Sequence, residues 1–384
     1  MWRAIASNAL TLFIVVLAAL AGLIGWAQLR YSSEGPLAQA ICLRVESGSS
    51  LGGVSRDLAE QGAVDHPYLL RIGADYAGKA DDLKAGSFLI PEGASMQQIV
   101  DIVTRGGQST CGTEIVYRIG VTGQDVQVRE LDPATNRFVT RAEFDPAAGE
   151  APAEYTELRD AGDTRYRVAM AEGATSWQVV EALKKADFLT GDVVQVPGEG
   201  TLAPDSYEVT AGGERGALLM QMQTRQEERL AEVWRNRAEG LPIDTPEEAL
   251  ILASLIEKET GVPEERRRVA SVFVNRLDRG MRLQTDPAVI YGVTEGKGAL
   301  GRGLRRSELD RETPYNTYLV AGLPPTPIAN PGLASLQAAV DPEQTEYLYF
   351  VADGSGGHAF ATTLAEHNAN VAEWRKIEAE RAGQ

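Results

Sequence analysis

The first hydrophobic pattern in the chain is one long apolar run near the N-terminus. Ala9–Ala27 holds 19 residues without a charge, and Trp26 lies near its end. A run of this length predicts a single membrane-spanning helix, with the tryptophan as an interfacial anchor. The alternative is a cleaved signal peptide, because Ala19-Leu20-Ala21 has the small-x-small form of a cleavage site. Since the apolar run continues past that site, the sequence favours an uncleaved anchor over residues 1–30, with the rest of the chain exported.

The next fifty or so residues alternate between strand and helix patterns. They predict a strand over Ile41–Val45, helices over Leu51–Gln61 and Pro67–Tyr76, and a strand over Gly86–Pro91. This βααβ order, ending in AGSFLIP, resembles a LysM-like module, which implies binding of glycans that contain N-acetylglucosamine. A small spacer domain is the alternative. We assign the module to residues 40–106.

Two segments share a pattern that is typical of a helix start. EGASMQQIVDIV begins at Glu92 and EGATSWQVVEAL begins at Glu172, with a fainter copy at Glu46–Ser50. In each copy a Ser or Thr can cap the helix that follows, and apolar residues then recur at helical spacing. The similarity indicates either a weak internal repeat or independently capped helices.

Residues 107–165 have a different pattern. Short β-prone runs over 115–121, 126–131 and 137–139 are separated by Gly, Pro and Asp clusters, which predicts a β-rich insertion or a long excursion. Cys42 and Cys111 lie in or near strands that can flank one another. An oxidising compartment permits a disulfide between them, and two buried thiols are the alternative.

Composition excludes some classes of function. The chain of 384 residues has 43% hydrophobic and 24% charged residues, which is ordinary for folded domains. Its formal net charge is -17, so a broad basic surface for nucleic acid is not expected. The 2 cysteines and 3 histidines lack the spacing of a zinc site. We therefore expect no nucleic-acid partner, no metal and no cofactor.

The most informative segment is the helix predicted over Thr245–Gly261. Thr245 and Glu248 have the spacing of a capping box, and Gly261 marks the helix end. At about 100° per residue, Glu259 continues one apolar stripe. The stripe consists of Leu252, Leu255 and Ile256.

A carboxyl group at position 259 is therefore expected to be partly desolvated and to face the negative end of the helix dipole. Both effects favour the protonated form, which a general acid needs near neutral pH. Glu257 points elsewhere, and two residues apart on a helix the two glutamates cannot converge on one atom. The alternative is that both glutamates pair with arginines just downstream, namely Arg266, Arg267 and Arg268.

Four motifs follow one another between Leu250 and Trp374. They are LIEKETG, VASVFVNRLDRGMRLQTDPAVIYG, ETPYNTYLVAGLPPTPIANPG and EYLYFVADGSGGHAF. In this order they closely resemble the endolytic murein transglycosylase family, also called YceG-like proteins. The resemblance implies a lysozyme-like α+β catalytic domain over residues 166–384, and it places the family's catalytic glutamate at Glu259. The whole chain is then of the α+β class, and the 107–165 insertion departs from the simplest family members.

The resemblance also implies the reaction, which is lytic cleavage of the MurNAc–GlcNAc bond of peptidoglycan. One carboxyl group protonates the glycosidic oxygen and then takes the proton of the muramic acid 6-hydroxyl. That hydroxyl attacks its own anomeric carbon and leaves a 1,6-anhydro end. Because the nucleophile is intramolecular, no second carboxylate is needed to activate water.

Other polar residues of the motifs fit a role in placing the sugar. Amides and hydroxyls bond to sugar hydroxyl and acetamido groups, and aromatic rings pack on pyranose faces. The alternatives are that Asp286 caps a helix, that Tyr315 is a core tyrosine, and that His358 is a structural histidine rather than one that touches substrate. The predicted substrate-binding residues are Gln284, Thr285, Asp286, Tyr315, Asn316 and Tyr318.

Location and partners follow from the same resemblance. It implies a single-pass protein of the inner (plasma) membrane whose catalytic domain faces the periplasmic side. There it is expected to terminate nascent glycan strands of peptidoglycan, in contact with peptidoglycan synthases. The competing function is a non-catalytic, membrane-anchored scaffold that binds glycan.

Overall fold

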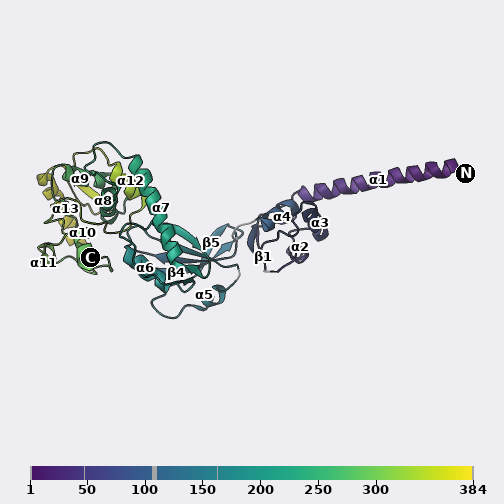
Figure 1. Cartoon of the computed structure of the whole chain (residues 1–384), viewed down its shortest axis with the longest axis horizontal. Coiled ribbons are helices and arrows are strands. Elements are labelled where there is room, and N and C mark those ends of the chain that lie inside the picture. The colour runs from purple at the N-terminus through teal and green to yellow at the C-terminus, as the bar shows by residue number, and fades with distance from the viewer. Residues whose placement is uncertain (1, 47, 106–109, 162, 383–384) are drawn as a thin grey trace. The chain divides into compact units, whose positions relative to one another are not determined.

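The structure is a computed structural model that describes residues 2–46, 48–105, 110–161 and 163–382. Helices and strands both occur along the chain (Figure 1), which confirms the predicted α+β class. The first residues of the predicted insertion, 107–109, lie outside the described residues. Two compact units are present. Unit 1 is Met1–Ile115, Gln127–Glu143 and Ala151–Arg165, and unit 2 is Val116–Val126, Phe144–Glu150 and Tyr166–Gln384.

Helix α1 runs from Trp2 to Ser32 and contains the predicted apolar run. Its segment Ala9–Ser32 has 24 residues, and its most apolar window is not buried within the protein. At 1.5 Å per residue this segment measures about 36 Å, more than the hydrocarbon thickness of a bilayer. Within the described residues it is the one helix that is long and apolar enough to cross a membrane, a property that a signal sequence shares.

Unit 1 continues with the βααβ order that the sequence predicts. β1 (Ile41–Val45) pairs antiparallel with β2 (Gly86–Ile90), and α2 (Leu51–Glu60) and α3 (Pro67–Tyr76) come between them. α4 (Met96–Thr104) follows β2 and begins with a reciprocal capping box of Ser95 and Gln98. The predicted cap is thus confirmed. The core of these elements includes Leu43, Leu58, Leu70, Ile90 and Ile99.

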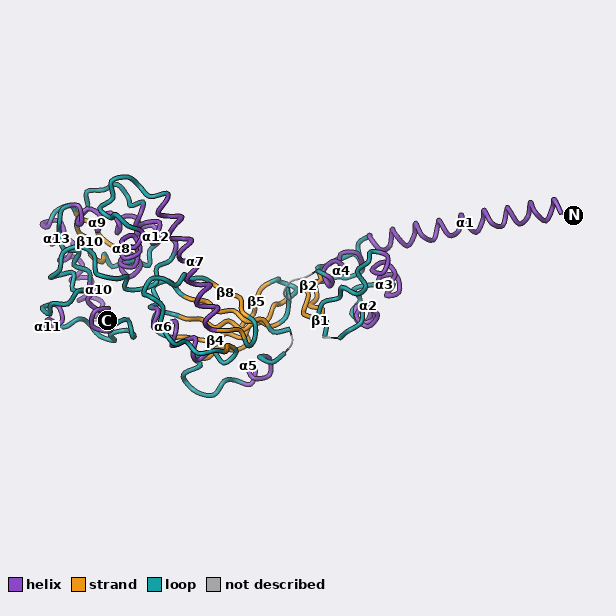
Figure 2. The backbone as a smooth tube through the Cα atoms, viewed as in Figure 1, coloured by secondary structure: helices purple, strands orange, loops and turns teal. Residues whose placement is uncertain are grey.

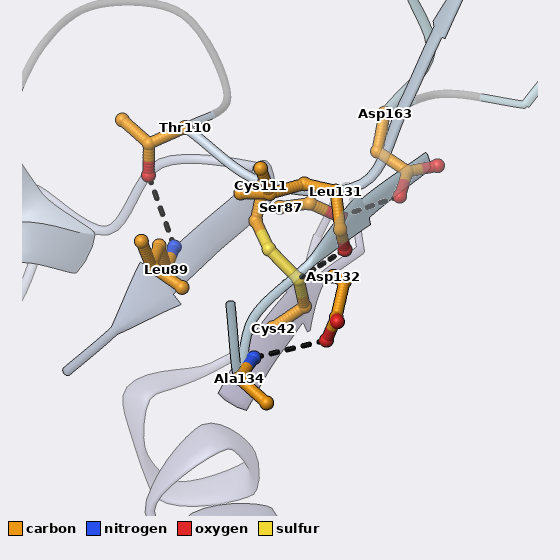
Figure 3. Close-up of a disulfide and its surroundings, with 9 residues drawn as sticks. All are labelled: Cys42, Ser87, Leu89, Thr110, Cys111, Leu131, Asp132, Ala134 and Asp163. Carbon is orange, nitrogen blue, oxygen red and sulfur yellow. Dashed lines mark hydrogen bonds between the residues drawn. A yellow bond between two sulfur atoms is a disulfide. The ribbon is translucent and has the colours of Figure 1, made fainter. Parts of the chain in front are cut away.

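A disulfide joins Cys42 of β1 to Cys111 and spans a sequence separation of 69 residues (Figure 3). The backbone beside Cys111 is fixed to β2, because the amides of Thr110 and Cys111 both donate to the carbonyl of Ser87, at 2.9 and 3.1 Å. The Thr110 hydroxyl also accepts from the amide of Leu89, at 3.0 Å. The sequence is compatible with either a disulfide or two buried thiols, and the structure contains the disulfide.

A five-stranded sheet has the strand order β5-β4-β3-β6-β8, and three of its strands, β4, β5 and β8, are labelled in Figure 2. Its strands are β3 (Thr113–Ile119), β4 (Gln124–Asp132), β5 (Arg137–Phe144), β6 (Arg165–Met170) and β8 (Ser206–Val209). The three predicted β-prone runs are strands, but β5 is longer than its predicted run. Most of β5 is exposed, so its sequence lacks the alternation of a half-buried strand.

Helix α6 (Ser176–Lys185) lies in unit 2 and begins with the predicted Thr175 cap, again as a reciprocal box with Gln178. The buried Tyr117 hydroxyl of β3 donates to the carbonyl of Ala182 at 2.7 Å and holds α6 to this strand. The shorter elements nearby are α5 (Ala153–Leu158), β7 (Leu189–Thr190) and β9 (Gly213–Glu214), of which β7 and β9 pair in parallel.

Several helices of unit 2 pack against α8 (Pro246–Glu259). Residues Ala249–Ile256 of α8 are all buried. Four helices contact it: α7 (Arg215–Arg235), α9 (Arg266–Asp278), α10 (Asp286–Thr294) and α12 (Leu333–Val340). Two short helices, η1 (Pro263–Glu265) and α11 (Arg306–Leu309), connect them. Near the C-terminus β10 (Tyr349–Ala352) pairs antiparallel with β11 (His358–Ala361), and α13 (Leu364–Ala382) follows.

The start of α8 differs from the prediction in one bond. The Thr245 hydroxyl accepts from the amide of Glu248 at 3.2 Å, as predicted. The Glu248 carboxylate, however, accepts from the amide of Asp244 at 2.6 Å, so the predicted reciprocal capping box is wrong. The glutamate side chain reaches one residue past the cap, and its negative charge still lies at the helix N-terminus, where it is favourable.

Asn330, in the loop before α12, is fully buried and joins two other segments of unit 2. Its side-chain amide donates to the carbonyl of Ala174 at 2.9 Å, and its side-chain oxygen accepts from the amide of Leu202 at 2.9 Å. Its backbone carbonyl accepts from the amide of Gly173 at 2.9 Å. Since a buried amide without partners is costly, these bonds fix the loop that leads into α12 and therefore the packing of α12 on α8.

Candidate active site

Glu259 is the last residue of α8, and the chain leaves the helix at Thr260. The three apolar residues of its stripe, Leu252, Leu255 and Ile256, are fully buried. Glu259 itself is partly exposed, and Thr260 is buried. The predicted stripe is therefore confirmed, and the carboxyl group lies where the buried face of the helix reaches solvent.

The electrostatic surroundings of Glu259 favour its protonated form. Burial raises the pKa of this carboxyl group to about 7, and the charge of Asp286 acts in the same direction. The Thr285 hydroxyl and electrostatic interactions with His358 and with the positive charge of Arg276 oppose the shift. The C-terminal end of α8 adds negative potential. A carboxyl group with a pKa near 7 is able both to give and to take a proton near neutral pH.

The loop that carries Gln284 and Thr285 is fixed by hydrogen bonds to Thr317. The Thr285 amide donates to the Thr317 hydroxyl at 2.9 Å, and that hydroxyl donates to the Thr285 carbonyl at 3.2 Å. Gln284 has a left-handed backbone with φ of 53°, which is uncommon for a residue other than glycine and occurs often at functional sites. Its side chain is exposed.

The Thr285 hydroxyl lies close to the Glu259 carboxyl group and lowers its pKa. This hydroxyl oxygen is buried, and among the described residues no group meets the distance and angle of a regular hydrogen bond to it. A hydroxyl group in this position is available to donate a hydrogen bond to the carboxylate of Glu259 and so to stabilise it.

Arg276 of α9 holds the same loop through hydrogen bonds, and the sequence analysis did not identify it. Its guanidinium group donates to the carbonyls of Leu348 at 2.6 Å and Leu283 at 2.8 Å, and to the side-chain oxygen of Gln284 at 3.3 Å. The residue is only 7% exposed. Its positive charge lowers the pKa of Glu259, so it both orders the loop and acts on the acid.

Asp286 and Tyr318 form a pair beside Glu259. The Tyr318 hydroxyl donates to the Asp286 carboxylate at 2.7 Å. Burial and this bond raise the pKa of Tyr318, so the phenol keeps its proton. Asp286 is exposed and is the first residue of α10, whose cap position is Thr285. A negative charge at this position also favours the helix. The interpretation of Asp286 as the helix cap is wrong, because Thr285 occupies the cap position; its contact with substrate stays a prediction.

Tyr315 and Asn316 are less available to a ligand. The ring of Tyr315 packs against Tyr291 with centroids 5.0 Å apart, and its hydroxyl bonds to Thr326 at 2.8 Å. Asn316 is fully buried. Its side-chain nitrogen donates to two carbonyls in the loop 309–311, and its oxygen accepts from the Tyr318 amide at 3.1 Å. Asn316 therefore holds the loop that presents Tyr318.

His358 has a structural partner, in line with one of the interpretations that the sequence allows. Its Nδ1 lies 2.8 Å from the carboxylate of Glu265, which also accepts from the His358 amide at 3.0 Å. Glu265 belongs to η1, which follows the end of α8 closely in sequence. The pair therefore fixes the start of β11 to the segment beside Glu259.

A family model described as the YceG-like family matches residues 134–373, which is more than half of the chain. The chain belongs to the YceG-like family. It is 28% identical over 336 residues to a Bacillus subtilis (strain 168) protein named endolytic murein transglycosylase, a match that covers 85% of this chain and 82% of the relative. A Streptococcus pneumoniae (strain D39) protein of the same name is 25% identical over 358 residues, and the match covers 87% of this chain and 58% of that protein.

A crystal structure of a putative YceG-like protein from Listeria monocytogenes is also similar. Its sequence is 24% identical, and the superposition has a TM-score of 0.44 over 86% of this chain and 99% of that one.

Glu257, the other glutamate of the LIEKETG motif in this YceG-like protein, has a different environment from Glu259. Glu257 accepts from the amide of Gly332 at 3.0 Å, at the start of α12. The three downstream arginines have other partners: Arg266 pairs with Glu172, Arg267 with Asp341 and Arg268 with Glu343. Within the described part of the chain neither glutamate pairs with them, so the alternative of two structural ion pairs is wrong. The two glutamates diverge, as predicted.

The site of this YceG-like chain is suited to proton transfer. One partly exposed acid is flanked by a hydroxyl group, a buried arginine and a phenol that is held by a carboxylate. In the ranges that the structure describes, no group of three or more His, Cys, Asp or Glu residues is arranged to hold a metal ion. The acid, the hydroxyl group, the arginine and the phenol together suit general acid–base chemistry at Glu259.

Proposed function

We propose that this chain is an endolytic murein transglycosylase that cleaves the MurNAc–GlcNAc bond and leaves 1,6-anhydro ends. The observation that carries the proposal is the Glu259 carboxyl group, whose pKa is raised to about 7 at the end of a buried helix. It lies within the region matched by the YceG-like family. The names of the bacterial relatives support the same activity.

In the proposed first step the protonated Glu259 gives its proton to the glycosidic oxygen. The bond from the anomeric carbon of muramic acid to that oxygen breaks, and the electron pair stays with the departing sugar. In the second step the 6-hydroxyl oxygen of the same muramic acid forms a bond to the anomeric carbon. Its proton goes to the Glu259 carboxylate, so the acid is regenerated and no water is consumed.

The neighbours of Glu259 supply a separate part of the proposal. Arg276 and the Thr285 hydroxyl stabilise the carboxylate that exists between the two steps. The exposed Gln284 and Asp286 side chains are available to hydrogen-bond the sugar, and Tyr318 presents a partly buried ring held by Asp286. For Tyr315 and Asn316 we propose a supporting role, because their polar groups already have partners.

The finer architecture is also a proposal. We propose that α1 is an uncleaved anchor in the inner membrane, that residues 40–106 form a LysM-like glycan-binding module, that 107–165 is a β-rich insertion, and that residues 166–384 form a lysozyme-like catalytic domain on the periplasmic side. The 24-residue apolar segment supports the anchor, and the βααβ order supports the module. Contact with peptidoglycan synthases is proposed from the family resemblance alone.

The test uses the full chain in detergent with isolated murein, and mass spectrometry of the released fragments. We expect 1,6-anhydro ends from the wild type and a loss of roughly 10²- to 10⁴-fold for Glu259→Gln, as is typical for removal of a general acid. Glu257→Gln is the matched control, because glutamine keeps an oxygen that accepts from Gly332 and the variant should retain activity.

Three other outcomes contradict parts of the proposal. Fragments with an added water and a reducing end indicate a hydrolase. Sedimentation of the protein with murein, without any new anhydro ends, favours the non-catalytic scaffold. Full activity of Glu259→Gln together with an inactive Glu257→Gln moves the acid to the other glutamate and leaves the reaction unchanged.

A further inference from the structure

A hollow in unit 2, away from the residues around Glu259, combines an aromatic ring with charged side chains. It has a volume of about 230 Å³ and is bordered by the β3–β4 turn, by α6 and by the segment that follows α10. None of the residues that surround Glu259 lines it. The lining residues that matter here are Gly123, Gln124, Trp177, Glu181, Lys185 and Gly298.

The side chains of this hollow include two groups that are free to bind a ligand. Trp177 is partly exposed, and among the described residues its ring stacks on no other ring and its N–H has no acceptor. Lys185 is exposed and, in the same part of the chain, has no acidic partner, whereas Glu181 already pairs with Lys184 at 2.6 Å. A free tryptophan face and a free ammonium group in one concave site are suited to a pyranose ring that carries an acidic substituent.

The rim of the hollow is already in place without a ligand. The side-chain nitrogen of Gln178 donates to the carbonyl of Val121 at 2.9 Å and fixes the β3–β4 turn to α6. The Thr175 hydroxyl donates to the carbonyl of Gly296 at 2.6 Å and fixes the third wall. A Cβ atom added to Gly123 or Gly298 would meet nothing within 4 Å. The opening therefore lies between fixed walls, which lowers the entropy cost of binding.

The hollow and the candidate active site border opposite ends of α10. This helix begins at Asp286, beside Glu259, and its 9 residues span about 13 Å. Gly298, on the rim, follows its end closely. The other wall is also near α8, because a Cβ atom on Gly173 would lie 3.6 Å from both Lys258 and Val121. A polymer that is cleaved at Glu259 has further sugars that extend beyond the cleaved bond.

We propose that this hollow is a remote glycan subsite, in which Trp177 packs against the face of an N-acetylated hexosamine of the same strand that is cleaved at Glu259. Lys185 then faces a carboxylate of the stem peptide that muramic acid carries. The inference rests on the proposed function, and it adds a selection for long, peptide-bearing strands. Short oligomers bind only at the positions next to Glu259 and do not extend to the hollow.

The test compares kcat/KM of the full chain on long glycan strands and on the shortest oligomers that it cleaves. We expect Trp177→Ala to lower the ratio of the long-strand value to the short-oligomer value roughly two- to tenfold, through KM, because one aromatic contact is lost. Trp177→Phe should restore part of the ratio. Trp374→Ala removes another partly exposed tryptophan of unit 2 and is the matched control.

A second variant tests the site without removing the tryptophan. Gly123→Leu places a side chain into open space at the rim and should lower the same ratio by obstructing the hollow. Lys185→Ala should lower it only for strands that carry peptides, and an amidase that strips the peptides should abolish that difference. Equal losses on long and short substrates, or no change of the ratio in either Trp177→Ala or Gly123→Leu, would overturn the proposal.

A binding measurement separates this proposal from the proposed function. Peptide-bearing glycan strands are sedimented with full-length Glu259→Gln and with the double variant Glu259→Gln/Trp177→Ala. Weaker binding of the double variant supports the subsite even if the wild type makes no anhydro ends. Equal binding of both proteins overturns the subsite even if the enzyme is active.

Discussion

Replacing Glu259 with glutamine should make the fold more stable at alkaline pH, although it should inactivate the enzyme. The pKa of this carboxyl group is raised from 4.5 to about 7 in the folded protein. A group whose pKa is higher in the folded state binds its proton more tightly there, so the wild type loses stability as pH rises between these two values. At 1.36 kcal/mol for each pKa unit, the loss above pH 7 is about 3 kcal/mol. Glutamine does not ionise and avoids it.

Hydrogen exchange of α8 amides is the suitable assay, because a chain with two compact units need not unfold in one step. The opening free energy of α8 is measured from pH 4 to pH 8 for the wild type, Glu259→Gln and the control Glu257→Gln. We expect the difference between Glu259→Gln and the wild type to grow by about 3 kcal/mol over this range and to stay level above it. The control removes a carboxylate from the same helix end and corrects for its general effect. A difference that is constant with pH, or that falls as pH rises, refutes the reasoning.

Three further predictions concern pH, packing and the disulfide. The kcat/KM for anhydro-end release should fall as pH rises above about 7, because Glu259 loses its proton. Asp286→Asn removes a charge that raises the pKa of Glu259, so this fall in kcat/KM should begin at lower pH. Rate measurements from pH 5 to 9 in which the fall begins at the same pH contradict the role of that charge. Arg276→Leu should lower the opening free energy of α9 in unit 2 by about 3 kcal/mol, since it leaves buried carbonyls without their charged donor, and hydrogen exchange of α9 amides measures this. Reduction of the Cys42–Cys111 bond should destabilise unit 1 by about 4 kcal/mol, as expected for a closed loop of 69 residues; a Cys42→Ser variant that still responds to the reductant would argue against it.

The elements with strong local signals were predictable from sequence. α8 begins at Pro246 after its Thr245 cap and ends two residues before Gly261, because caps and helix breakers act within one turn. The same holds for the Ser95 and Thr175 helices. The order of the five-stranded sheet was not predictable, since it depends on pairings between distant segments such as β6 with β8. β5 was underestimated because both of its faces are largely exposed.

The residues of the candidate site likewise divide into those that the sequence predicts and those that it does not. The location of Glu259 on a buried stripe follows from helical spacing, so the sequence contains it. The contact of His358 with Glu265 joins residues 93 positions apart, and no local pattern predicts it. Arg276 did leave a signal: it lies seven residues after Val269 and three after Phe273, on the buried face of α9. A charged residue in that register indicates a buried hydrogen-bonding role.

Polar residues within a motif do not all face a ligand. Asn316 is the clearest example, because its amide is used entirely to hold the loop 309–318. A sequence pattern marks such a residue as polar and well placed, but it does not indicate whether its hydrogen bonds are already made inside the protein. Direct contact with a sugar requires those bonds to break first, at about 1 kcal/mol each or more.

The bond between Cys42 and Cys111 also has a consequence for studies in living cells. Thiols of this kind stay reduced in the cytosol and become oxidised outside it. The fraction of the pair that an alkylating reagent captures therefore reports on which side of the membrane unit 1 has folded. The orientation of the untagged chain becomes measurable from its two native cysteines, without a fused reporter that can itself alter insertion.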